Sequence, residues 1–470
     1  MTTVKLIGLD FGTTTSSAVI ASAMLMHNSI TGRQELSGLH ECFRSEIVFT
    51  PFSDQGLNDT KVQEYLDAWL AAGDVRPEEI FGGGALLTGL AAQQQNAALL
   101  VRLIRQRLGE ALIATAGDPR LESWLAFQAS VAGLSRLHPD RWIVNLDIGG
   151  GTTNLALGRN GEVLRTGCLF VGARHVQVAP GSYRIVKLST YARQMFDHLA
   201  IAKGPGDCLT EAEVEAVLNF YLNLLASALA GDQEALQTPI ARLHQQVPFN
   251  LPADAGDVIV TLSGGVGELV YAHLHGKPLP SRTYFGDLGI DLAQRLLAWP
   301  RWAEHFKTYR PECAGRATVY GLLRYTTQIA GSTLFLPNPT ILPLRDLPIL
   351  GRITVKSTDE QTRNLLDLIG RSTHGGCVRI ILEMGNSTVV AALGMRIAKT
   401  LRAVGFPSTQ PLVLIVQENV GKTLGHYVTE WGALPLKLVV LDEIETRDAQ
   451  FVQIGSLHDQ VVPVSFFGLN

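Results

Sequence analysis

The chain carries one unusual turn twice, and this repeat limits what it can fold into more than any other feature. An apolar run from Ile143 ends in Asp147 and is followed by Gly149-Gly150-Gly151-Thr152-Thr153. Near the N-terminus, Leu9 is followed by Asp10-Phe11-Gly12-Thr13-Thr14-Thr15. Laid over each other without a gap, the two stretches match at the leucine, the aspartate, the first glycine and the threonine pair Thr15 and Thr152. A buried strand that ends in an acid and a glycine turn is therefore predicted twice, once in each of two lobes.

The residue types in these turns suit a phosphate ligand with a metal ion. Glycines let bare backbone N–H groups approach an anion closely, and threonine hydroxyls can donate hydrogen bonds to phosphate oxygens. A carboxylate at the strand end is a suitable ligand for Mg²⁺. One such turn alone is more often an ordinary polar β-turn, but two in register favour function. The predicted phosphate-binding residues are Gly12, Thr13, Thr14, Thr15, Gly149, Gly150, Gly151, Thr152 and Thr153, with Asp10 and Asp147 as metal ligands.

A third glycine turn completes the pattern. The apolar run from Val258 to Leu262 leads into Ser263-Gly264-Gly265-Val266-Gly267-Glu268, which predicts a buried strand followed by the N-terminus of a helix. The three stretches, in this order, resemble the superfamily of actin, Hsp70 chaperones and sugar kinases. The resemblance implies an α/β fold with two actin/Hsp70-like, RNase H-like ATPase lobes that clamp Mg-ATP. It also implies that Gly264, Gly265, Gly267 and Glu268 border the nucleoside.

At 470 residues the chain is long enough for two or three domains. We expect a first lobe over residues 1–140, a second lobe over 141–335, and an additional C-terminal α/β domain over 336–470, after a proline-rich stretch. Three apolar strands are expected in that domain, at Cys377–Leu382, Leu412–Gln417 and Leu436–Leu441. Gly421-Lys422-Thr423 is not interpreted as a nucleotide-binding P-loop, because Val416 stands where that motif needs a glycine.

Composition narrows the class of protein. The formal net charge is −4 and there is no run of Lys and Arg, which argues against nucleic acid as a partner. Five scattered cysteines fit a reducing compartment. The N-terminus lacks the pattern of a signal peptide, and no apolar run reaches the length of a membrane span. We therefore expect a cytoplasmic protein that does not associate with a membrane.

Four further features each allow a structural and a functional interpretation. Glu122 could orient an attacking water, as an acid between the lobes does in Hsp70-like chaperones, or it could stabilise a helix N-terminus. Gly82-Gly83-Gly84 is expected to form a flexible turn before a strand rather than a phosphate contact. The small residues from Gly315 to Gly321 suit a hinge helix or plain tight packing. His273 and His275 lack a third ligand nearby and are expected on the surface.

The flanking motifs make the resemblance more specific. They include Thr88-Gly89, Leu121-Glu122-Ser123, Val171-Gly172-Ala173-Arg174, Leu344-Arg345-Asp346-Leu347-Pro348 and Gly421-Lys422-Thr423-Leu424-Gly425. Together they are similar, nearly end to end, to the reactivating factors of ethanolamine ammonia-lyase. This resemblance implies a chaperone that uses ATP and Mg²⁺ to release damaged cobalamin from the lyase. Leu90 and Ala173 depart from the family pattern, where an acid and a glycine are usual, and this puts details of the site in doubt.

The family resemblance leaves self-association and residence in a bacterial microcompartment open. Two other classes of function also stay open on the sequence alone. A small-molecule kinase would use the same clamp, but it needs a general-base aspartate facing a substrate hydroxyl, and the sequence offers no obvious candidate. A filament-forming actin relative would need a self-complementary head-to-tail surface, which a sequence does not reveal.

Overall fold

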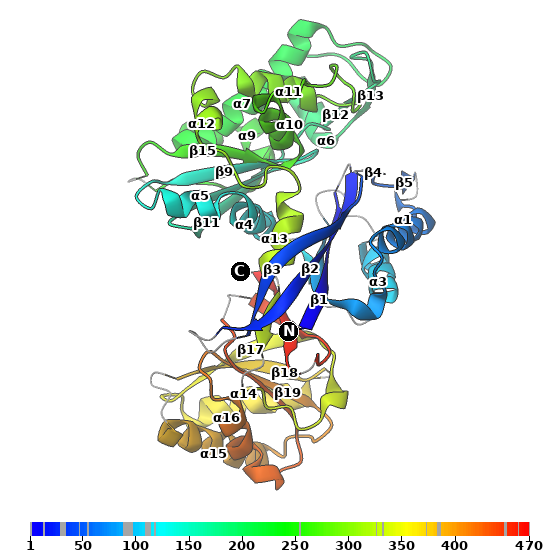
Figure 1. Cartoon of the computed structure of the whole chain (residues 1–470). Coiled ribbons are helices and arrows are strands. Elements are labelled where there is room, and N and C mark those ends of the chain that lie inside the picture. The colour runs from blue at the N-terminus through cyan, green and yellow to red at the C-terminus, as the bar shows by residue number, and fades with distance from the viewer. Residues whose placement is uncertain are drawn as a thin grey trace.

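The computed structural model describes residues 2–12, 15–28, 34–46, 48–53, 56–87, 97–108, 114–116, 119–252, 255–325, 327–330, 333–372, 374–382, 387–445, 449–458 and 460–469. Three α/β parts follow one another along the long axis of the molecule (Figure 1). The part built mainly from residues 141–310 lies at the top of that view, the N-terminal sheet lies in the middle, and the C-terminal part lies at the bottom. Both chain ends lie near the junction of the middle and bottom parts.

The first sheet has the strand order β3-β2-β1-β7-β8. Its strands are β1 (Thr2–Phe11), β2 (Thr15–His27), β3 (Gln34–Arg44), β7 (Ile80–Leu87) and β8 (Ala114–Ala116), with β4 (Val48–Phe49) beside β2. Strand β1 is antiparallel to β2 and parallel to β7. Helices α1 (Asp59–Ala72) and α3 (Ala97–Arg107) cover one face, and a small hairpin of β5 (Phe52–Ser53) and β6 (Gly56–Leu57) precedes α1. The first acidic turn thus connects the two central strands.

The second sheet repeats this arrangement, in the order β14-β11-β10-β9-β15. Its strands are β9 (Ile143–Ile148), β10 (Thr153–Arg159), β11 (Glu162–Leu169), β14 (Gln245–Val247) and β15 (Ile259–Ser263). Strand β9 is antiparallel to β10 and parallel to β15, as β1 is to β2 and β7. The two acidic turns therefore occupy equivalent places in two sheets that share the order of four strands, β3-β2-β1-β7 and β11-β10-β9-β15.

Alternating apolar residues let helices cover both faces of the second sheet. Val144 and Leu146 face the larger core, while Ile143 faces a smaller one. On the larger side lie α6 (Thr190–His198), α7 (Glu211–Ala230), α8 (Gln233–Leu236), α9 (Pro239–Leu243), α10 (Gly264–Leu274), α11 (Gly289–Leu297), α12 (Ala303–Thr308) and the hairpin of β12 (Val176–Val178) and β13 (Ile185–Leu188). On the smaller side lie α4 (Pro119–Ser130) and α5 (Ala132–Leu137).

The C-terminal part contains a seven-stranded sheet in the order β16-β22-β21-β17-β18-β19-β20. Its strands are β16 (Thr327–Ala330), β17 (Leu344–Thr354), β18 (Gly376–Ile381), β19 (Pro411–Val416), β20 (Lys437–Leu441), β21 (Ala449–Ile454) and β22 (Val462–Leu469), with helices α14 (Asp359–Arg371), α15 (Ser387–Val404) and α16 (Gly421–Val428). The run from β17 to β20 is parallel, and Lys422 is an exposed residue of α16. Short 3₁₀ turns lie at Pro77–Glu79, Pro339–Ile341 and Glu430–Gly432. The predicted fold class, two actin-like lobes with an additional C-terminal α/β domain, is confirmed.

Helix α13 (Ala317–Tyr325) holds the two lobes together, and glycines bring it close to its neighbours. A Cβ atom on Gly8 of β1 would lie 2.7 Å from Val319, and one on Gly84 of β7 would lie 2.6 Å from Leu322. Within the helix, a Cβ on Gly321 would lie 2.6 Å from the carbonyl oxygen of Leu125 in α4. The small residues of this segment therefore serve a backbone-close crossing of α13 over α4 and the first sheet.

The prediction of a flexible turn at Gly82-Gly83-Gly84 is wrong. All three residues lie inside β7, whose eight residues are buried. They are glycines because the strand is covered at close range: Thr327 lies over Gly82 and Leu322 over Gly84. Gly83 has a φ of +145°, and a side chain there would clash with the backbone of Ile7. A glycine run is therefore a packing device here rather than a loop.

The borders of the three parts stay a proposal. Helices α4 and α5 precede residue 140 but pack on the second sheet, and α13 precedes residue 335 but packs on the first. The chain thus crosses between the lobes more than once, and we keep 1–140, 141–335 and 336–470 only as a working division.

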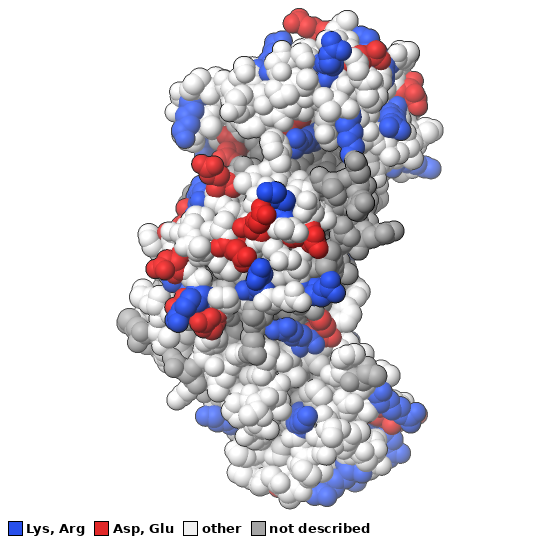
Figure 2. All heavy atoms as spheres, turned by 90° about the vertical axis from the view of Figure 1, so that its right-hand side faces the viewer, with Lys and Arg blue, Asp and Glu red and all other residues white. Residues whose placement is uncertain are grey.

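On the face shown in Figure 2, Lys and Arg are interspersed with Asp and Glu over the upper and middle parts of the molecule. Over these two parts the mixing leaves no extended field of one sign, whereas Lys and Arg outnumber Asp and Glu on the lower part of this face. Within the described residues, no helix is long and apolar enough to cross a membrane.

The close crossing of α13 and α4 predicts an unusual effect of alanine. Alanine is a better helix former than glycine by about 1 kcal/mol, so Gly321→Ala should stabilise a helix that has free space around it. Here the added methyl group meets the carbonyl of Leu125, and we expect a net loss of about 1–3 kcal/mol, measured by urea denaturation. Gly204→Ala is the control, because no atom lies within 4 Å of a Cβ there. A Gly321→Ala variant as stable as wild type would contradict the tight crossing.

Candidate functional site: a cleft between the two lobes

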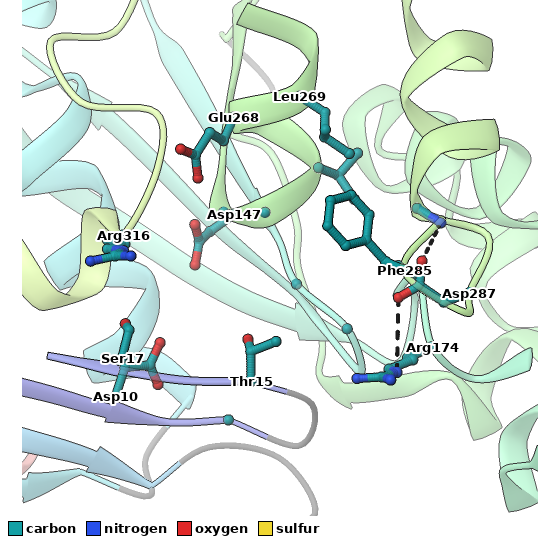
Figure 3. Close-up of a pocket in the computed structure, with 18 of the residues that line it drawn as sticks. Asp10, Thr15, Ser17, Asp147, Arg174, Glu268, Leu269, Phe285, Asp287 and Arg316 are labelled. Atoms are coloured by element: carbon teal, nitrogen blue, oxygen red, sulfur yellow. Dashed lines mark hydrogen bonds and ion pairs between the residues drawn. The ribbon is translucent and has the colours of Figure 1, made fainter. Parts of the chain in front are cut away.

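A cleft of about 500 Å³ lies where the two sheets face each other. The hairpins β1–β2 and β9–β10, the N-terminal ends of α10 and α13, and the loop before α11 all contribute to its walls. Figure 3 shows Asp10, Thr15 and Ser17 entering it from the first sheet, with Asp147 and Glu268 opposite. The cleft is therefore shared between lobes, and any ligand in it contacts both.

The two hairpins close with the same hydrogen bond. The N–H of Gly12 donates to the carbonyl of Thr15 at 2.9 Å, and the N–H of Gly149 donates to the carbonyl of Thr152 at 2.9 Å. Six of the predicted phosphate residues line the cleft, namely Gly12, Thr15, Gly149, Gly150, Gly151 and Thr152. Thr13 and Thr14 lie outside the described residues. The repeat seen in the sequence is thus a repeat of backbone geometry.

Asp10 and Asp147 line the same cleft. Asp147 is buried, and its Oδ1 accepts a hydrogen bond from the hydroxyl of Ser263 at 2.7 Å. The buried Oδ1 of Asp10 has no hydrogen-bond partner within the part of the chain that the structure describes. Burial, and then the nearby charge of Asp147, raise the pKa of Asp10 to about 7, while Arg316 lowers it. Burial raises the pKa of Asp147 to about 6, and the Ser263 hydrogen bond opposes this shift. Two acids that resist ionisation together form a site for a cation.

The start of α10 forms the wall predicted for the nucleoside. Gly264 has a φ of +77°, and a Cβ there would lie 2.6 Å from the carbonyl oxygen of Ile148, so only glycine fits. Gly264, Gly265 and Glu268 line the cleft as expected.

Two of the predicted ligand residues have other tasks in the structure. Gly267 lies against Leu262, where a Cβ would be 3.0 Å from its backbone, and this contact packs α10 onto β15. Thr153 is buried, and its hydroxyl donates to the carbonyl of Val171 at 2.8 Å. Neither is part of the cleft wall, so we withdraw both as nucleotide contacts.

Glu122 lies in the first turn of α4, where it is buried and lines the cleft. Its Oε2 accepts a hydrogen bond from the side-chain amide of Asn154 at 2.8 Å. Asn154 pairs with Asp147 across the two strands of the second hairpin. Glu122 therefore stabilises the second hairpin through its hydrogen bond to Asn154 of β10, in addition to any contact with a ligand.

Sequence analysis did not assign the basic residues of the cleft, which are Arg174, Lys277 and Arg316. Arg316 donates from Nη2 to the carbonyl of Ser45 at 2.6 Å and so contacts the first lobe. Its buried Nη1 has no hydrogen-bond partner in the described part of the chain, and burial lowers its pKa. Two sequence signals pointed to these positions without giving a role: Arg174 ends the motif from Val171, and Arg316 precedes the small-residue helix.

A buried acid, Asp287, also lines the cleft and was not assigned from the sequence. Burial raises the pKa of Asp287 to about 6; the N–H of Gly289 and the charge of Arg174 oppose this shift. His273 and His275, by contrast, lie exposed at the C-terminal end of α10.

These residues fit a nucleotide bound with Mg²⁺. Three basic side chains complement phosphate charge, and the unpartnered oxygen of Asp10 lies opposite Asp147 as a ligand for a divalent cation. Among the described residues no group of three or more His, Cys, Asp or Glu is arranged to hold a metal. Two carboxylates that face one cleft, those of Asp10 and Asp147, would fit Mg²⁺, which usually keeps several waters and takes one or two carboxylates.

The whole chain matches one protein family. The match is to the family described as ethanolamine utilisation protein EutA, and it covers residues 2–469. The chain belongs to the EutA family. It is 30% identical over 479 residues to the ethanolamine ammonia-lyase reactivase EutA of Escherichia coli K12, across 98% of this chain and 97% of that one. It is 31% identical over 470 residues to the protein of the same name from Salmonella typhimurium LT2, with the same coverage.

Among solved structures, this EutA-family chain is similar to a PPX-GPPA enzyme of Aquifex aeolicus, with 16% identity and a TM-score of 0.35 over 60% of this chain and 75% of that chain. A second similar structure is MreB5 of Spiroplasma citri bound to AMPPNP, with 14% identity and a TM-score of 0.30 over 63% of this chain and 96% of that chain.

The burial of Asp10, together with the nearby charge of Asp147, predicts that removing the Asp10 charge stabilises the protein without ligands. In the absence of metal and nucleotide, Asp10→Asn should have a free energy of unfolding about 1 kcal/mol higher than wild type at pH 8, measured by urea denaturation. Because the pKa of Asp10 is about 7 in the folded state and about 4 in the unfolded state, the folded wild type is destabilised as the pH rises from about 4 to about 7. The difference in the free energy of unfolding between Asp10→Asn and wild type should therefore be smaller at pH 5 than at pH 8.

The matched control is Asp197→Asn, which neutralises an exposed acid of α6 and should show no pH-dependent gap. If Asp10→Asn is no more stable than wild type at pH 8, burial and the charge of Asp147 do not raise the pKa of Asp10.

Proposed function

We propose that this protein binds Mg-ATP in the cleft between its lobes and uses it to reactivate ethanolamine ammonia-lyase. Reactivation here means release of damaged cobalamin, so that intact adenosylcobalamin can bind. The name of the two curated relatives supports the partner. The single observation that carries the ATP site is the pair of equivalent hairpins, each with an acid, a glycine turn and a threonine, facing one cleft.

The chain's own residues are suited to position a triphosphate. Backbone N–H groups of the hairpin glycines and the hydroxyls of Thr15 and Thr152 would bind phosphate oxygens, and Arg174 and Arg316 would add positive charge. Asp10 and Asp147 would hold Mg²⁺, which neutralises charge that develops on the phosphates when bound. Phosphoryl transfer to water asks little more of a protein than this positioning.

The link from ATP to the lyase would be the distance between lobes. Each hairpin belongs to a different sheet, so a γ-phosphate held by both draws the lobes together, and its loss removes the shared ligand. Such a change acts on a partner only if the open and closed forms bind that partner with different affinity. We infer that one nucleotide state binds the lyase in a conformation that loosens cobalamin.

Self-association and residence in a microcompartment remain predictions from the family resemblance. One observation supports the kinase alternative. Asp287 is a buried acid that lines the cleft, and a kinase needs a general-base aspartate there to accept a proton from a substrate hydroxyl. Family membership favours the reactivase over the kinase.

The hydrolysis prediction concerns the two aspartates. Asp10→Ala and Asp147→Ala should each lower Mg-dependent ATP hydrolysis by at least about 100-fold, because each removes a metal ligand from the transition state. Circular dichroism and gel filtration should show an unchanged fold. If both variants hydrolyse ATP at the wild-type rate, the metal site lies elsewhere.

The reactivation prediction is tested with ethanolamine ammonia-lyase inactivated by cyanocobalamin. Intact coenzyme and Mg²⁺ are added together with one of three mixtures. These are wild-type protein with ATP, wild-type protein without nucleotide, and the Asp147→Ala variant with ATP. We expect lyase activity to return only with wild-type protein and ATP. Equal recovery without nucleotide, or none with it, would falsify the reactivase assignment. Phosphorylation of an added sugar or other alcohol would instead support a kinase.

A further inference from the structure

The cleft continues beyond the two hairpins, away from the paired aspartates. In Figure 3, Arg174 and Asp287 lie on one side of Thr15, whereas Asp10, Asp147 and Arg316 lie on the other. All of these side chains line the same cavity. A triphosphate held by the hairpins would therefore have acids on both sides, with Asp287 on the side away from the proposed metal ligands.

Backbone hydrogen bonds tie Asp287 to the second hairpin. The N–H of Leu288 donates to the carbonyl of Ala173 at 3.0 Å. The N–H of Ala173 in turn donates to the carbonyl of Gly149 at 3.1 Å, and the N–H of Arg174 donates to that of Gly150 at 2.7 Å. Asp287 is thus two backbone hydrogen bonds away from a predicted phosphate-binding glycine, and its position is set by that hairpin.

The carboxylate of Asp287 is buried but not saturated by close partners. Its Oδ1 accepts a hydrogen bond from the N–H of Gly289 at 2.9 Å, and its Oδ2 lies 3.9 Å from Nε of Arg174. The guanidinium of Arg174 lies 4.8 Å from the centre of the Phe49 ring, so it is held between a side chain of each lobe. The charged groups that act on Asp287 are Arg174 and Asp291. One carboxylate oxygen of Asp287 therefore accepts a close hydrogen bond, while the other faces the guanidinium of Arg174 at a longer distance.

We propose that Asp287 orients and deprotonates the water that attacks the γ-phosphate of ATP, and that Arg174 holds Asp287 and the phosphate in register. This proposal rests on the proposed ATPase function. The water oxygen forms a bond to the γ-phosphorus while the bond from that phosphorus to the bridging oxygen breaks, and its electron pair leaves with ADP. The water's proton passes to the Asp287 carboxylate and then to solvent, which leaves inorganic phosphate.

Glu122 is the rival for this task, since sequence reasoning named it first. Its Oε2 already accepts the hydrogen bond from Asn154 at 2.8 Å, so this oxygen serves to hold β10. Within the described part of the chain, the Oδ2 of Asp287 has only the 3.9 Å contact to Arg174, which leaves that oxygen available for a water. Burial keeps the pKa of Asp287 near 6, so the carboxylate is ionised at neutral pH yet is a better base than an ordinary aspartate.

The test compares three variants that each replace an acid with its amide. Asp287→Asn should lower kcat for ATP hydrolysis by at least about 100-fold, the usual worth of a general base, while the affinity for Mg-ADP, measured by calorimetry, changes less than about threefold. Asp442→Asn is the matched control. Asp442 is also a buried acid, but it directly follows β20 in the C-terminal part and is not part of the cleft wall. We expect that variant to hydrolyse ATP within about threefold of wild type.

Glu122→Gln separates the two candidate acids. If Glu122→Gln abolishes hydrolysis while Asp287→Asn does not, or if Asp287→Asn weakens Mg-ADP binding as much as it slows hydrolysis, the inference is overturned. A second variant, Asp287→Glu, guards against a folding defect, because it keeps a carboxylate and should recover part of the lost rate. A wild-type protein that binds no nucleotide would contradict the proposed function itself, whereas a hydrolysing wild type with an equally active Asp287→Asn contradicts only this inference.

Discussion

The close crossing of α13 over α4 is the contact on which the rest of the structure depends. Two sheets of equal topology can face one cleft only if something fixes their distance without filling the space between them. Gly321 allows the backbones of the two helices to approach, and Gly8 and Gly84 allow the same helix to lie on the first sheet. Since Arg316 precedes α13 and contacts Ser45 of the first lobe, the same element also reaches the ligand cleft.

Much of this could be predicted from the sequence, because the decisive signals are local. The strand–acid–glycine–threonine turns revealed a duplicated hairpin, and the Gly264-Gly265 turn located the third wall of the cleft. Asp10 and Asp147 face that cleft as the repeat suggested. Family membership could also be inferred, since the motifs extend nearly from end to end.

The remaining residues could not be found in this way, because their roles are set by tertiary contacts. Gly82-Gly83-Gly84 has the composition of a loop, yet it is strand because α13 and Thr327 lie directly over it. Thr153 belongs to the motif, but the strand alternation turns its hydroxyl towards Val171. Arg174 and Asp287 are more than 100 residues apart in the sequence. They lie close together because the N–H of Leu288 donates a hydrogen bond to the carbonyl of Ala173. No local pattern marks such a pair.

The central claim is that the nucleotide state sets the distance between the lobes. Two exposed native cysteines, Cys42 in the first lobe and Cys208 in the second, can carry spin labels once Cys313 is replaced by serine, because Cys168 and Cys377 are buried. The distance between the labels would be measured by pulsed electron paramagnetic resonance with Mg-ADP and with a non-hydrolysable ATP analogue. The account predicts a shorter and narrower distribution with the ATP analogue. Identical distributions in both states, at saturating nucleotide, would contradict it.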